Sequence, residues 1–88
     1  MPQKEKILLV EDNKTLAKLL AKKTEDSLSV EVDIAYSMEE AKNFISNTEK
    51  PYFIALLDLN LPDAPDGEVV DYVLSHNIEV IVLTGNLD

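Results

Sequence analysis

The sequence predicts an α/β domain with a doubly wound parallel sheet, because apolar runs of strand length alternate with segments of helical spacing along its 88 residues. Three of these runs, 7–10, 52–57 and 80–83, are apolar or aromatic at every position, as expected of strands buried on both faces. A fourth segment, 30–34, alternates apolar and charged residues, which is typical of a strand with one wet face. Four strands and three helices are therefore expected.

The first half of the chain shows two strand–helix units. The run 7–10 is followed by the acidic turn Glu11-Asp12-Asn13 and then by leucines and alanines at helical spacing, with Asn13 as a candidate N-cap. After the alternating strand 30–34, Ser37 and Glu40 have the spacing of a capping box. A second helix is expected there, and Pro51 ends it.

The second half repeats the pattern. The strand 52–57 leads into Asp58, and a loop rich in proline and aspartate follows at 61–67. Valines and a leucine between residues 69 and 74 indicate a third helix, and 79–84 reads as the fourth strand.

The strand patterns also predict the order of the sheet. Only the segment 30–34 alternates, so it belongs at an edge, and right-handed crossovers then favour the order 2-1-3-4. The direction of winding reverses between the first and third strands, which is where ligands bind in such sheets.

The fourth strand has the composition of an interior strand, yet few residues follow it. We therefore expect residues 1–88 to form a single domain that is incomplete at its C-terminus and lacks a fifth strand and the last helices. The domain would be truncated, swapped or completed by another chain. A homodimer through the exposed fourth strand is one expected form.

The composition excludes several classes of function. Eight lysines and no arginine face 17 acidic residues, and the net charge of −9 disfavours nucleic acid and anionic membranes as partners. No apolar run approaches the roughly 20 residues that span a bilayer. The N-terminus shows no secretory signal and the chain has no cysteine, so we expect a cytoplasmic protein.

Four side chains that could take part in chemistry lie at the ends of adjacent strands in the predicted order. Glu11 and Asp12 follow the first strand, Asp58 ends the third, and Thr84 ends the fourth. Three crowded carboxylates repel one another, and a hard divalent cation such as Mg²⁺ would relieve this repulsion. The sequence therefore predicts a magnesium site where the winding reverses.

Three segments, taken together, resemble the receiver domain of two-component response regulators, which has the flavodoxin-like fold. They are Lys6-Ile-Leu-Leu-Val-Glu-Asp-Asn13, Leu56-Leu-Asp-Leu-Asn-Leu-Pro62 with Gly67 beyond it, and Val80-Ile-Val-Leu-Thr-Gly85. The resemblance spans the whole chain in the right order.

The resemblance implies a role for each matching residue. Asp58 would accept a phosphoryl group from a histidine kinase or a phosphotransfer protein, as an aspartyl phosphate. The Mg²⁺ ion would be held by Asp12 directly, by Glu11 through water, by Asp58, and by the backbone carbonyl of Asn60.

Two further residues would contact the phosphoryl group, Thr84 through its hydroxyl and Gly85 through its backbone N–H. The resemblance makes the protein a switch that an output domain or a downstream protein reads, and not a turnover enzyme.

The chain departs from the family pattern in two places. The spacing from Asp58 to Gly67 is one residue longer than usual, and residues 51–88 contain no lysine to match the one that receivers place at the end of the fifth strand. The family's switch aromatic on that strand is absent as well. We therefore expect this chain alone to be phosphorylated poorly.

Two alternatives stay open. A receiver-like interaction module would never be phosphorylated, and the missing lysine is compatible with it. An aspartate-nucleophile phosphatase would need an acid two positions after Asp58, where this chain has Asn60. The remaining acids of the second half, Asp63, Asp66 and Asp71, are expected to form a solvated rim.

Overall fold

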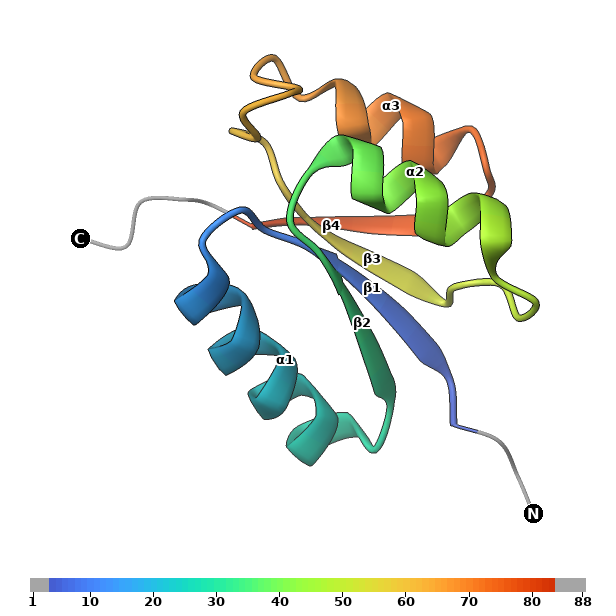
Figure 1. The fold of residues 1–88 in the computed structure, drawn as a ribbon. Coiled ribbons are helices and arrows are strands. Elements are labelled where there is room, and N and C mark those ends of the chain that lie inside the picture. Colours follow the sequence, from blue (N-terminus) through green and yellow to red (C-terminus); the bar gives the residue numbers. More distant parts are fainter. Residues whose placement is uncertain (1–3, 84–88) are drawn as a thin grey trace.

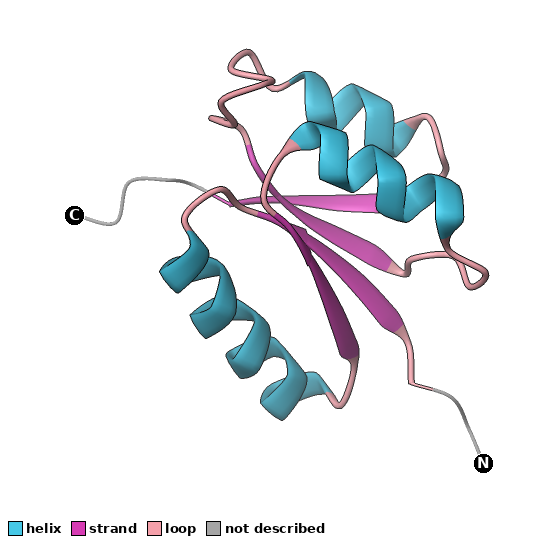
Figure 2. Cartoon of the chain, viewed as in Figure 1, coloured by secondary structure: helices cyan, strands magenta, loops and turns pink. Residues whose placement is uncertain are grey.

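The computed structural model describes residues 4–83, which form four parallel strands and three helices in strict alternation (Figure 2). The sheet has the order β2-β1-β3-β4, as the sequence predicted. The strands are β1 (Lys6–Val10), β2 (Glu31–Ala35), β3 (Ile54–Asp58) and β4 (Glu79–Leu83). The helices are α1 (Lys14–Leu28), α2 (Met38–Asn47) and α3 (Glu68–Leu74).

The helices cover the two faces of the sheet unequally, with α1 on one face and α2 and α3 side by side on the other (Figure 1). Alternate residues of β1 therefore face different layers. Leu9 packs with Ala17 and Ala21 of α1, whereas Leu8 and Val10 belong to the larger core beneath α2 and α3. All three β1 side chains are fully buried, so the first strand is the centre of both layers.

Both predicted helix caps are present. The Asn13 side chain accepts the Leu16 N–H at 3.0 Å, and the Ser37 hydroxyl accepts the Glu40 N–H at 3.1 Å. The Glu40 carboxylate reaches back to the N–H of Tyr36 at 2.9 Å, one residue before the position that a capping box requires.

The third strand begins at Ile54, two residues later than the sequence indicated. Tyr52 precedes the strand and is buried, whereas Phe53 is half-exposed. The Tyr52 hydroxyl donates to the Asp33 carboxylate at 2.6 Å, and Lys6 pairs with the same carboxylate at 3.1 Å. The polar face of the edge strand β2 is thus partly covered by a Lys–Asp–Tyr network.

The fourth strand lies at the other edge of the described sheet. Ile81 and Val82 point to opposite faces and are 50% and 41% exposed. Among residues 4–83, no helix is long and apolar enough to cross a bilayer.

The Lys–Asp–Tyr network generates a stability prediction. Replacing Tyr52 by phenylalanine removes the donor to Asp33, and we expect it to lower the free energy of unfolding by about 1 to 2 kcal/mol. Urea denaturation followed by circular dichroism measures this change.

Tyr36 provides the matched control. Like Tyr52 it has a lysine amine 5.4 Å from its ring centroid, but its hydroxyl makes no hydrogen bond within the described part of the chain. Tyr36→Phe should change stability by less than about 0.5 kcal/mol. Equal losses in the two variants would contradict the assigned role of the Tyr52 hydroxyl.

Candidate functional site

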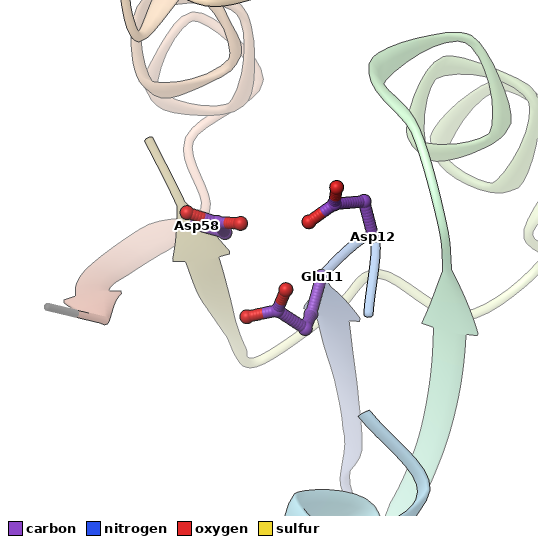
Figure 3. Close-up of side chains that lie close together, drawn as sticks. All are labelled: Glu11, Asp12 and Asp58. Carbon is purple, nitrogen blue, oxygen red and sulfur yellow. The ribbon is translucent and has the colours of Figure 1, made fainter. Parts of the chain in front are cut away.

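The candidate site lies where β1 and β3 end side by side. These two strands pair directly, with Val10 opposite Leu57, so the residues that follow them share one edge of the sheet. Glu11 and Asp12 leave the end of β1, and their side chains point toward Asp58 at the end of β3 (Figure 3). This edge is the point where the winding of the sheet reverses.

The three acids form a compact cluster. Each offers one carboxylate oxygen, and these atoms lie within 4.8 Å of one another. Glu11 and Asp58 are only 6% exposed, whereas Asp12 is open to solvent. The cluster is therefore buried on the side of the sheet and accessible on the side of Asp12.

Backbone amides support two of the three carboxylates. The N–H of Asn13 donates to Glu11 Oε2 at 3.1 Å, and the N–H of Asn60 donates to Asp58 Oδ1 at 3.0 Å. In both turns the donor lies two residues after the acid. The chain thus folds back over each carboxylate and fixes its direction.

Burial raises the pKa of Glu11 to about 7, and the neighbouring Asp12 and Asp58 carboxylates add to this effect, while the Asn13 N–H opposes it. The negatively charged cluster is therefore unfavourable by itself. It gains free energy when it binds a positive species, either a proton or a metal cation.

The donor set fits a hard divalent cation. Three carboxylates supply only oxygen ligands, which Mg²⁺ and Ca²⁺ prefer, and no histidine or cysteine takes part in the cluster. The exposed side at Asp12 leaves room for water or a substrate oxygen. Glu11, Asp12 and Asp58 could therefore hold the magnesium ion that the sequence predicts.

Of the other predicted site residues, Asn60 lies beside the cluster, and Thr84 and Gly85 lie outside the described residues. The roles assigned to all of them stay predictions. A cavity of about 510 Å³ lies elsewhere, between α2 and the residues Lys6 of β1, Asp33 of β2 and Tyr52, and no carboxylate of the cluster lines it.

Sequence reasoning missed one residue near the site. Asp63 was expected in a solvated rim, but its carboxylate accepts the N–H groups of Met38 at 2.9 Å and Glu39 at 3.0 Å. Both donors belong to the start of α2, which lies 24 and 25 residues earlier in the chain. No local sequence pattern predicts a contact between residues so far apart in the chain.

Comparison with known proteins gives matches among solved structures. No family model matches the chain, and no curated protein matches it significantly. A two-component system response regulator/GGDEF domain protein is 35% identical over 97% of the chain, with a TM-score of 0.81. The chain spans only 34% of that protein's length.

Two further structures are similar. The bacteriophytochrome response regulator AtBRR is 31% identical over 97% of the chain and 69% of its own length, with a TM-score of 0.78. The MaeR response regulator is 18% identical over 96% of the chain and 70% of its own length, with a TM-score of 0.81, which shows a shared fold.

The raised pKa of Glu11 generates a prediction about pH. A carboxyl whose pKa is higher in the folded state, about 7 against 4.5, stabilises the fold fully below pH 4.5, and this contribution disappears as the pH rises to 7. We expect Glu11→Gln to raise the melting temperature at pH 8, where the variant removes a crowded charge. At pH 5 this advantage should be much smaller, because the side chain of the folded wild type is then largely protonated.

Thermal denaturation in EDTA at both pH values measures the difference. Glu39→Gln is the control, because Glu39 is an exposed acid outside the cluster. An advantage of Glu11→Gln that is equal at pH 5 and pH 8 would show that Glu11 is not strained by its neighbours.

Proposed function

Since the chain belongs to the receiver-domain family of two-component response regulators, we propose that it accepts a phosphoryl group on Asp58 and acts as a signalling switch. The observation that carries this proposal is the cluster of Glu11, Asp12 and Asp58, whose carboxylate oxygens lie within 4.8 Å of one another. The cluster stands at the strand ends where a doubly wound sheet binds its ligands.

The cofactor in this proposal is Mg²⁺. Asp12 would hold it directly and Glu11 through water, while Asp58 and the backbone carbonyl of Asn60 complete the protein's share of the ligands. When bound, the ion neutralises charge between these carboxylates and the incoming phosphoryl oxygens. The residues of the chain contribute by holding the ion and by placing Asp58 beside it.

The transfer step follows from the chemistry of Asp58. A carboxylate oxygen attacks the phosphorus of a phosphohistidine, the P–N bond breaks, and its electron pair stays on the imidazole of the donor. The Asn60 N–H already bonds Oδ1 of Asp58, so we assign the attack to Oδ2. The Thr84 hydroxyl and the Gly85 N–H are the proposed contacts of the transferred group.

The proposed partners follow from this reaction. A histidine kinase or a phosphotransfer protein in the cytoplasm donates the group, and an output domain or a downstream protein reads the altered surface. The protein then passes through one phosphorylation cycle per signal and is not a turnover enzyme. The homodimer through β4 stays a prediction, which light scattering at micromolar concentration tests.

Ligand binding provides the first test. MaeR, which shares the fold, is bound to beryllium trifluoride in its structure, and this anion on a carboxylate imitates an aspartyl phosphate. In saturating Mg²⁺, we expect beryllium trifluoride at about 100 times its dissociation constant to stabilise the protein further, by about 2.7 kcal/mol. For a domain of this size the melting temperature rises by at least about 10 °C.

Asp58→Asn should abolish this rise, whereas Asp71→Asn, a charge-matched change at an exposed position of α3, should preserve it. A rise of the same size in Asp58→Asn would refute the assignment of the acceptor.

Covalent transfer provides the second test. Intact-mass spectrometry after incubation with a small-molecule phosphodonor and Mg²⁺ should show one base-labile phosphoryl adduct that Asp58→Asn lacks. Residues 51–88 contain no lysine to pair with the transferred group, so we expect the 88 residues alone to react slowly. A stable adduct that survives in Asp58→Asn would favour a different acceptor.

A further inference from the structure

The loop between β3 and α3 links the end of β3, where Asp58 lies, to the start of α2 in the layer that α2 and α3 form. Its apolar residues Leu61 and Ala64 are fully buried, and the Ala64 N–H donates to the Leu61 carbonyl at 3.0 Å. Asp63 lies between them and is exposed. With Leu61 and Ala64 buried, the Asp63 side chain lies on the exposed side of the loop.

The Asp63 carboxylate spans two amides of α2. Its Oδ1 accepts the N–H of Met38 at 2.9 Å, and its Oδ2 accepts the N–H of Glu39 at 3.0 Å. With the Ser37 hydroxyl on the Glu40 N–H, three of the four amides that a helix start leaves without partners are satisfied. The bonds from Met38 and Glu39 lower the pKa of Asp63, so this carboxylate is charged at neutral pH.

Helix α2, which donates to Asp63, is itself held in place by the core. Ala41 is fully buried in the larger core, and Phe44 and Ile45 pack against that core. In the loop, the Asn60 N–H bonds Asp58 Oδ1 three residues before Asp63. The loop that touches the acceptor is therefore attached through Asp63 to a helix that is anchored on the sheet.

We infer that Asp63 is a positioning residue for the magnesium site, because its two bonds to α2 hold the loop that places Asn60 against Asp58. This inference rests on the proposed function, since it assigns a consequence to Asp63 at the site where Mg²⁺ would bind. The carboxylate touches neither Mg²⁺ nor the phosphoryl group. It acts through the backbone of the loop.

A purely structural role for Asp63 makes a different prediction. If Asp63 only caps α2, its loss would resemble the loss of Ser37, which caps the same turn but belongs to another loop. If only its charge matters, its loss would resemble that of Asp66, which lies in the same loop and is also exposed. Ser37→Ala and Asp66→Ala are therefore the matched controls.

The experiment is a Mg²⁺ titration by calorimetry at pH 7 of the wild type and the variants, each checked for folding by circular dichroism. We expect Asp63→Ala to weaken Mg²⁺ binding about tenfold, which is the low end of the effect of losing outer support for metal ligands. Asp63→Asn should lose less, because its amide oxygen can still accept one N–H. Ser37→Ala and Asp66→Ala should stay within about twofold of the wild type.

The outcomes separate the inference from the function on which it rests. If the wild type binds Mg²⁺ and Asp63→Ala matches either control, the inference is overturned and the proposed function stands. If the wild type binds no Mg²⁺, both fail. Should Asp63→Ala not fold, Asp63→Asn decides, and wild-type affinity in that variant together with lost protection of the Met38 or Glu39 amide from hydrogen exchange overturns the inference.

Discussion

The mutual repulsion of three carboxylates at one edge of the sheet is the interaction around which the site is organised. Because β1 and β3 are parallel neighbours, the residues that follow them share this edge, and burial of Glu11 and Asp58 keeps water from screening their charges. The fully charged cluster is therefore unfavourable, which raises the pKa of Glu11 and leaves a free energy gain available for a proton or a metal cation. In the proposed function, Mg²⁺ would supply the positive charge that lets an anionic phosphoryl group approach these carboxylates.

The rest of the fold keeps these charges together. Leu8, Leu9 and Val10 are fully buried in two separate layers, so the end of β1 cannot retreat from the end of β3 without opening the core. Residue Leu57, opposite Val10, anchors the third strand in the same way. Apolar burial is non-directional, but here it acts through paired strands, and it balances a repulsion that would otherwise separate their ends.

Most of the structure that could be predicted follows from patterns among residues that are close in the sequence. Alternation in residues 30–34 placed β2 at the edge, and Asn13 and Ser37 cap helices through bonds that span three residues. The carboxylate cluster was also predictable, because strand order alone brings the ends of β1 and β3 together. Asp63 was not, since its donors lie 24 and 25 residues away and only tertiary packing of α2 against the loop brings them within reach.

The way in which the loop after Asp58 is held explains why one exposed residue can matter at a buried site. Leu61 and Ala64 fix the depth of the loop in the core, but apolar contacts allow sliding along the surface that they touch. Two consecutive amides donate to separate oxygens of Asp63, and these two hydrogen bonds define a direction as well as a distance. The resemblance implies that the spacing from Asp58 to Gly67 is one residue longer than usual, and a longer loop has more conformations available. The directional attachment of Asp63 to α2 restricts that freedom three residues beyond Asn60, whose N–H bonds Asp58.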